Sequence, residues 1–235
     1  MIRHSNYEVP IMKLLLFILM AATILPVAVR MLYAREPAAS SQATRVACVG
    51  DSITYGARIF NREVKCYPAQ LGAMLGTGYS VKNFGVNGAT LLKHGDIPFW
   101  KTRAFKAAQD FKPDIAVINL GANDAAVYNW IYKYEFVTDY VELIRIFQSN
   151  GCKMVWICYP APTYPGPYDF TEPVVVNEII PMIDELARQT GAKIIDLYRP
   201  LSGRPDLFPD TVHPNAEGAR LMAATVFSAI TSKDD

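Results

Sequence analysis

The chain has 235 residues, a formal net charge of +1, and a composition that is 51% hydrophobic and 19% charged. This length suits one domain with shorter additions, and the apolar content excludes a chain that is disordered throughout. Because Lys and Arg are not in excess, the charge gives no support to nucleic-acid binding, which needs basic side chains to neutralise phosphates.

The first predicted element is a secretory signal at residues 1–34. Lys13 precedes an apolar run from Leu14 to Val29, and small residues surround a predicted cleavage point after Ala34. A basic start, an apolar centre and small residues at the cut are typical of export signals. Met12 is an alternative start, because a compact signal begins there.

Residues 35–44 follow as a short predicted linker, rich in Ala and Ser. An uncleaved membrane anchor is the alternative reading of the N-terminus. The apolar run of about 16 residues is, however, shorter than the roughly 20 that span a bilayer. We therefore expect an exported protein, periplasmic or secreted, with no stable membrane partner after cleavage.

The remaining chain, residues 45–235, alternates between apolar runs and segments with helical spacing. The runs are predicted strands at 45–50, 79–85, 114–121, 153–160 and 192–198. The clearest of them are apolar nearly throughout, which is typical of strands covered on both faces of a parallel sheet. Helices are predicted at 67–75, 99–111, 134–151, 174–191 and 216–230. This order predicts an α/β three-layer sandwich with a five-stranded parallel sheet.

The four cysteines after the signal are expected to be mostly free thiols. Cys48 and Cys158 lie inside strand-like runs, where a thiol acts as a small hydrophobe, and a domain of this size does not need disulfides. Neither a CxxC pair nor an HExxH motif occurs, so a zinc site has no basis in the sequence.

The stretch "VACVGDSITYG" (46–56) ends a buried-looking strand in Gly50, Asp51 and Ser52. Gly, Asp and Ser suit an ordinary strand-to-helix turn with an N-cap. The alternative is a nucleophile at the mouth of a parallel sheet, because sites in open α/β sheets lie beyond the carboxyl ends of the strands.

Two histidines follow the signal. His213 lies in "PDTVHPNAEG", three residues after Asp210, and a carboxylate there can orient an imidazole that acts as a base. The alternative for His213 is a polar turn residue. His94 lies in a charged loop and is expected to face solvent.

Polar loops also follow the second and third predicted strands. "NFGVNGAT" contains Gly88, which is either a turn residue or a backbone N–H donor to an oxyanion. "NLGANDA" contains Asn123, whose side chain is either such a donor or a helix cap. Asp124 is expected to anchor its loop rather than to act in catalysis.

Taken in order, these blocks resemble the SGNH or GDSL hydrolase superfamily over residues 45–232. The blocks are Gly50-Asp51-Ser52, then Asn83-x-Gly85-x-x-Gly88, then Gly121-x-Asn123-Asp124, then Asp210-x-x-His213. The resemblance implies a flavodoxin-like α/β/α sandwich and neither a metal nor an organic cofactor.

The resemblance also assigns roles to residues of this chain. Ser52 is implied as the nucleophile, His213 as the general base and Asp210 as its orienting carboxylate. The oxyanion hole would comprise the Ser52 N–H, the Gly88 N–H and the Asn123 side chain. The first block departs from its commonest form at Tyr55, where Glu is frequent, and this change puts the pocket wall in question.

For the substrate, the sequences of several segments resemble those of bacterial sialate O-acetylesterases and related carbohydrate esterases. We therefore expect a small-molecule or glycan ester, cleaved at O-acetyl groups on sialic acid or a polysaccharide through an acyl-enzyme. Alternatives are a lysophospholipase or thioesterase with the same triad and, as a different class, a non-catalytic carbohydrate-binding protein. Candidates for substrate binding are Asp51 and Tyr55 beside the nucleophile and a set of aromatic residues: Trp100, Trp130, Tyr159, Tyr164 and Tyr168.

Overall fold

The computed structural model describes residues 43–167 and 172–232, which belong to a compact unit that begins at Ala43. The predicted signal at 1–34 and most of the predicted linker lie outside the described residues, as does Tyr168. None of the helices in the described ranges combines the length and the apolar character that crossing a membrane requires.

Five parallel strands form one sheet, in the order β2-β1-β3-β4-β5. The strands are β1 (Thr44–Gly50), β2 (Tyr79–Gly85), β3 (Ile115–Asn119), β4 (Met154–Tyr159) and β5 (Lys193–Asp196). Gly50 pairs with Gly85 on one side and with Asn119 on the other, so β2, β1 and β3 end together. The predicted five-stranded parallel sheet is therefore confirmed, each strand within about two residues of its expected bounds.

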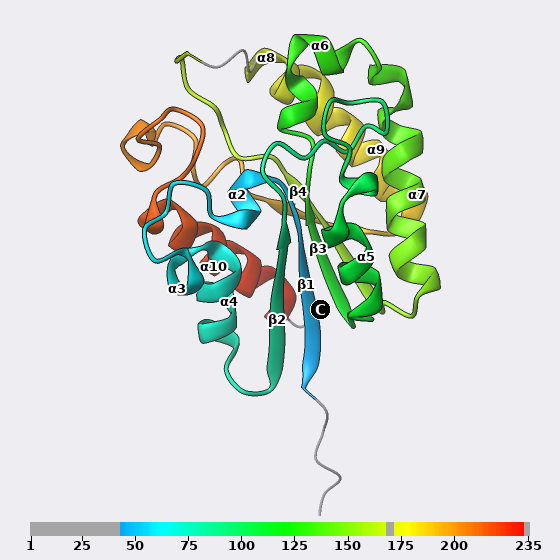
Figure 1. Ribbon diagram of the computed structural model, residues 1–235, viewed down its shortest axis with the longest axis vertical. Coiled ribbons are helices and arrows are strands. Elements are labelled where there is room, and N and C mark those ends of the chain that lie inside the picture. The colour runs from blue at the N-terminus through cyan, green and yellow to red at the C-terminus, as the bar shows by residue number, and fades with distance from the viewer. Residues whose placement is uncertain (1–42, 168–171, 233–235) are drawn as a thin grey trace, which may run out of the picture. The chain divides into compact units, whose positions relative to one another are not determined.

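Helices cover both faces of this sheet (Figure 1). On one face lie α4 (Tyr67–Leu75) and α10 (Ala216–Thr231), and on the other lie α5 (Arg103–Asp110), α7 (Phe136–Ser149) and α9 (Ile180–Thr190). Within β1, Ala47 and Val49 point to the α7 side whereas Val46 and Cys48 point to the α10 side. Because both faces are buried, the strand is apolar without alternation from Val46 to Val49.

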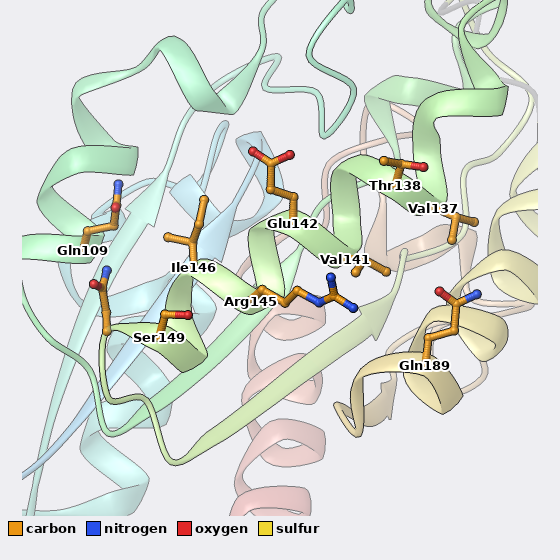
Figure 2. Close-up of a pocket in the computed structure, with 10 residues that line it drawn as sticks. Gln109, Val137, Thr138, Val141, Glu142, Arg145, Ile146, Ser149 and Gln189 are labelled. Atoms are coloured by element: carbon orange, nitrogen blue, oxygen red, sulfur yellow. The ribbon is translucent and has the colours of Figure 1, made fainter.

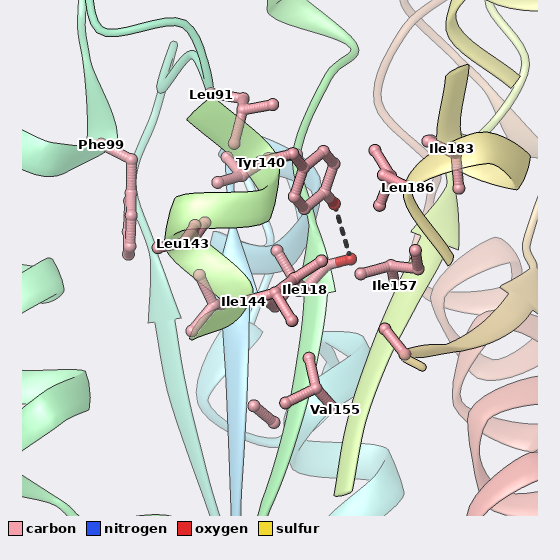
Figure 3. Packing of buried hydrophobic residues seen from close by; sticks show 14 of the residues in the cluster. Leu91, Phe99, Ile118, Tyr140, Leu143, Ile144, Val155, Ile157, Ile183 and Leu186 are labelled. Atoms are coloured by element: carbon pink, nitrogen blue, oxygen red, sulfur yellow. Dashed lines mark hydrogen bonds between the residues drawn. The ribbon is translucent and has the colours of Figure 1, made fainter. Parts of the chain in front are cut away.

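The helix predicted at 134–151 is confirmed as α7, which buries one apolar face. Phe136, Tyr140, Leu143, Ile144 and Phe147 are all fully buried against the sheet and α9 (Figure 3). The Tyr140 hydroxyl donates to the Ile118 carbonyl oxygen at 3.3 Å, so its polar end is satisfied within the core.

Two predicted helices are interrupted for identifiable reasons. The segment 99–111 breaks at Thr102, whose hydroxyl accepts from the Phe105 N–H and so caps α5 after the short 3-10 turn η1 (Phe99–Lys101). The segment 174–191 begins with a π-helical turn, η4 (Val175–Ile179). Pro181 follows at the start of α9 and has no N–H to donate to the preceding turn, which favours the wider turn.

Several short elements carry the connections and were not predicted, because fewer than two turns give no periodicity. They are α2 (Ser52–Tyr55), α3 (Arg62–Lys65), α6 (Val127–Trp130), α8 (Glu172–Val174), η2 (Asn123–Ala125), η3 (Lys133–Glu135) and η5 (Pro205–Leu207).

All four cysteines after the signal are free and buried, as expected. Burial raises the pKa of the Cys48 thiol to about 12. The thiolate is the reactive form of cysteine, so Cys48 acts as a packing residue.

Candidate active site

The turn after β1 places Ser52 at the carboxyl edge of the sheet. The carboxylate of Asp51 accepts from the Ile53 N–H at 2.9 Å and caps the four-residue helix α2. A Cβ atom added to Gly50 would lie 2.1 Å from Thr54 Oγ1, and one added to Gly85 would lie 2.2 Å from the Tyr55 nitrogen. These two glycines therefore let α2 pack directly against the strand ends.

Ser52, His213 and Asp210 form a continuous chain of hydrogen bonds. Ser52 Oγ lies 2.9 Å from His213 Nε2, and His213 Nδ1 lies 2.8 Å from Asp210 Oδ2. An ionised carboxylate only accepts, so Nδ1 carries the proton and Nε2 is left to accept from the Ser52 hydroxyl. The structure thus brings together the three residues to which the resemblance assigned catalytic roles.

The carboxylate of Asp210 is held in its ionised form. Partial burial acts against ionisation, but the hydrogen bonds from the His213 N–H, the His213 ring and the Val212 N–H together lower the pKa of Asp210. Arg58 Nε lies 3.3 Å from Asp210 Oδ2, on the side toward solvent. Arg58 was not predicted, because no periodic or motif signal surrounds it.

The loop that carries Asp210 and His213 is fixed from both sides. The Tyr164 N–H donates to the Thr211 carbonyl oxygen at 2.8 Å, which ties the loop to the segment after β4. Thr211 has a φ of 72°, a conformation that a β-branched residue rarely adopts. After His213, the side chain of Asn215 accepts from two backbone N–H groups and caps α10. The imidazole is therefore attached to a long helix through a rigid turn.

A cavity of about 300 Å³ opens beside the Ser52 hydroxyl. Its lining comprises Ser52, Ala57, Arg58, Asn87, Gly88, Asn123 and His213. Among the described residues, neither the Ser52 N–H nor the Gly88 N–H has a protein acceptor. The Asn123 amide donates one hydrogen to the Ala89 carbonyl oxygen at 3.0 Å, and its second hydrogen remains as a donor. Three donors thus line one small cavity with the serine.

Gly88 must be a glycine in this arrangement. Its φ is 74°, and an added Cβ would lie 2.8 Å from Ile97 Cδ1. Both facts indicate that the backbone here is turned to present its N–H where a side chain would not fit.

Asp124 and Asn83 support this edge of the sheet. Asp124 is fully buried and accepts from the Leu91 and Leu92 N–H groups, which confirms the expected loop anchor. Burial raises the pKa of Asp124 to about 6 and that of Asp51 to about 7. Asn83 donates to the Thr54 carbonyl oxygen at 2.8 Å and so holds α2 against β2. Its place in the second block is the signal that marked this residue.

The residues predicted to bind substrate do not line this cavity. Asp51 is buried and serves as the cap of α2, and the ring of Tyr55 lies under the Arg62 guanidinium. The Trp100 indole donates to the Leu91 carbonyl oxygen, and the Trp130 indole donates to Glu178.

Tyr159 at the end of β4 and Tyr164 in the loop that follows it are also bonded internally. The Tyr159 hydroxyl bonds Asp184 on α9, and the Tyr164 hydroxyl donates to the Leu201 carbonyl oxygen. Neither residue lines the cavity. Their contact with a sugar therefore stays a prediction. By contrast, His94 is exposed as expected, with Glu135 at 2.6 Å.

The described residues contain no group of three or more His, Cys, Asp or Glu side chains placed to hold a metal ion. A larger groove of about 570 Å³ runs along α7 (Figure 2), but its lining contains no histidine. Within the described ranges, a nucleophile, an imidazole and N–H donors meet beside Ser52.

A parallel α/β sandwich with a Ser–His–Asp array and converging donors at its carboxyl edge has the parts that nucleophilic acyl transfer requires. Residues 48–221 match the GDSL-like Lipase/Acylhydrolase family. The chain belongs to that family, as the four sequence blocks predicted.

Two kinds of relative agree with this family. The chain is 39% identical over 214 residues to a protein named acetylxylan esterase from Xylanibacter ruminicola, an overlap of 83% of this chain and 44% of that protein. The chain thus spans about half the length of this curated relative.

Among solved structures, the fold is similar to that of a carbohydrate acetylesterase from Sinorhizobium meliloti. The TM-score is 0.67 at 18% identity, over 80% of this chain and 98% of that one. An inhibitor-bound aryl esterase from M. smegmatis gives a TM-score of 0.68 at 16% identity, over 80% and 98% of the two chains. Likeness at such low identity shows the fold alone.

Proposed function

We propose that this protein is a serine esterase that removes O-acetyl groups from carbohydrates. The observation that carries the proposal is the hydrogen-bonded chain from Ser52 through His213 to Asp210, which opens on a cavity with three N–H donors. The acetylxylan esterase relative and the family match support an acetyl ester as the substrate.

The proposed mechanism follows from this geometry. His213 Nε2 takes the Ser52 proton as Oγ attacks the ester carbonyl carbon, and Asp210 stabilises the imidazolium that forms. The negative charge on the former carbonyl oxygen is held by the Ser52 N–H, the Gly88 N–H and the Asn123 amide. The imidazolium then protonates the sugar oxygen as its bond to the carbonyl carbon breaks, so the sugar leaves as an alcohol and an acetyl-serine remains. Water, activated by His213, hydrolyses this intermediate to acetate and restores the Ser52 hydroxyl.

The shape of the cavity favours a short acyl chain. Its volume of about 300 Å³ is at the lower end for ligand sites, and Ala57 is the only aliphatic side chain in its lining. A long acyl chain would leave most of its apolar surface in water, whereas a methyl group fits beside the serine. The small cavity therefore favours an acetylesterase over a lysophospholipase or thioesterase of the same superfamily.

Acetylated xylan is the carbohydrate that we propose first, because of the relative's name, with O-acetylated sialic acid as the second candidate. We also propose that residues 1–34 direct export, which would bring the enzyme to such extracellular glycans. The domain beginning at residue 45 would then be the mature catalytic part.

Acetate release from acetylated xylan and from O-acetylated sialic acid tests the proposal, with Ser52→Ala as the inactive control. A parallel series of p-nitrophenyl esters from acetyl to palmitoyl tests the acyl preference. We expect the highest kcat/KM for acetyl. A maximum at octanoyl or longer would move the assignment to a lipase or thioesterase, and glycan binding without hydrolysis would indicate a non-catalytic carbohydrate-binding protein.

A further inference from the structure

Exposed apolar side chains gather around α6, next to the third block of the site. They are Ile97, Val127, Tyr128, Ile131 and Tyr132, with exposed fractions between 37% and 65%. We call these five residues the α6 surface. They make up half of the large hydrophobic side chains that are exposed within the described ranges, and a concentration of this kind commonly marks a binding surface.

The α6 surface is continuous with the cavity beside Ser52. Ile97 lies so close to Gly88 that a Cβ there would be 2.8 Å from Ile97 Cδ1, and Gly88 lines the cavity. On the other side, η2 begins at Asn123, another lining residue, and α6 follows it at Val127. The surface therefore begins where the cavity ends.

A buried asparagine fixes the α6 surface relative to the oxyanion donors. Asn129 Oδ1 accepts from the Asp96 N–H at 2.9 Å, and Asn129 Nδ2 lies 3.0 Å from both Asp96 Oδ1 and the Asn123 carbonyl oxygen. Asn129 is 2% exposed, so these bonds are shielded from water. Three separate segments are thereby joined into one rigid unit, which is what a surface that positions a substrate requires.

The chemistry of the α6 surface suits a sugar chain. Tyrosine offers an apolar ring face and a polar hydroxyl, and pyranose rings present C–H faces with hydroxyls at their edges. The exposed His94 ring lies 5.5 Å from the Tyr132 ring and extends the aromatic area. A lipid surface fits less well, because Lys133 is the nearest basic residue along the chain and is paired with Glu178 at 2.7 Å.

We infer that the α6 surface binds the polysaccharide backbone that carries the scissile acetyl group. This inference rests on the proposed function and deepens it, because it explains how a small cavity recognises a polymer. The cavity holds the acetyl group, and the α6 surface binds neighbouring sugar rings through apolar contact. Trp130 was predicted for this role, but it faces the interior, whereas its neighbours Tyr128, Ile131 and Tyr132 are exposed.

The test compares a polymer with a small ester in the full-length protein. We expect Ile131→Ala/Tyr132→Ala to lower the ratio of kcat/KM for acetylated xylan to kcat/KM for p-nitrophenyl acetate at least tenfold, mainly through KM. Met74→Ala is the matched control, because Met74 has the same 37% exposure as Tyr132 but lies near the end of α4, before β2 begins. Its ratio should stay within twofold of wild type.

A ratio unchanged in the double variant would overturn the inference, as would equal losses on both substrates. A binding experiment tests this inference independently of the proposed function. In native gels containing unmodified xylan, the wild-type protein should be retarded and the double variant should not. This experiment decides the inference even if no glycan ester is hydrolysed. Retention of the protein by phosphatidylcholine vesicles instead of xylan would also overturn it.

Discussion

The cavity beside Ser52 and the groove along α7 differ in volume and in the segments that line them, and the smaller one holds the reactive groups. The groove is larger, about 570 Å³ against about 300 Å³, yet most of its lining comes from α7 itself. The smaller cavity collects residues from four loops that meet at the carboxyl edge of the sheet. A reactive site therefore depends on polar groups that converge from separate segments, and the volume of a pocket does not by itself indicate such a site.

The carboxylates near this edge of the sheet also differ, in burial and in pKa. Asp51 and Asp124 are buried and accept from backbone N–H groups, and burial raises the pKa of each. Asp210 is only partly buried, and its hydrogen bonds lower its pKa. The first two stabilise loops, whereas the third is the one placed beside an imidazole.

Removal of the Ser52 hydroxyl should cause the largest loss of activity among the variants in the two regions. We expect Ser52→Ala to lower kcat for p-nitrophenyl acetate about 10⁴-fold or more, because no other group can form the acyl-enzyme. Its Tm should stay close to wild type, since the substitution leaves the buried backbone unchanged. Retention of more than about a tenth of the wild-type rate would remove Ser52 as the nucleophile.

The next largest effects should come from the histidine and its carboxylate. His213→Ala should approach the loss seen for Ser52→Ala, because the base is absent. Asp210→Asn should lose less, because the imidazole is retained but poorly oriented. If Asp210→Asn had the wild-type rate throughout the pH profile, Asp210 would be a loop anchor, and another group would orient His213.

Loss of one oxyanion donor should have a smaller effect. Asn123→Ala is expected to lower kcat roughly 100- to 1000-fold, with little change in KM, because the amide bonds the oxygen mainly in the transition state. Asn87→Ala is the matched control, since Asn87 lines the same cavity without an assigned donor role. Equal losses in the two variants would argue against a specific role for Asn123.

The raised pKa of Asp51 predicts a pH dependence of stability. The folded protein holds the Asp51 proton up to about pH 7, whereas the ordinary value is 3.8. Stability from this group is therefore complete below about pH 3.8 and is lost as the pH rises through about 7, with a slope of at most about 1.4 kcal/mol per pH unit.

Asp51→Asn removes this titration and keeps an oxygen that can cap α2. The free energy of unfolding of the variant should match wild type near pH 4, exceed it increasingly up to about pH 7 and keep a constant excess above that pH, which denaturant titrations at several pH values measure. A constant offset between the two proteins across this range would contradict the assigned cause.

The smallest effect is expected in the α7 groove. Arg145→Ala should leave kcat/KM for p-nitrophenyl acetate within twofold of wild type, because Arg145 lines only the groove. A tenfold loss would show that the groove is coupled to the site beside Ser52 and would break the contrast between the two regions.

Much of this protein could be predicted from the sequence, because the relevant signals are local. Two-sided burial made the central strands β1, β3 and β4 largely apolar runs, and α7 repeated its apolar residues with helical spacing over four turns. The polar residues after successive strands had to meet at one edge, since parallel strands all end on the same side of a sheet. The positions of Ser52 and Asn123 at this edge follow from that rule.

Tertiary structure alone decided which side chains face one another. Ser52 and His213 are 161 residues apart, and their 2.9 Å contact depends on how the loop before α10 packs against the segment after β4. In α6, four residues are too few for periodicity to show that Trp130 points inward and Tyr128 outward. The partner of Asp210 on its solvent side, Arg58, is likewise set by packing. Local sequence determines the elements and their ends, but contacts between distant segments arise only when the whole core assembles.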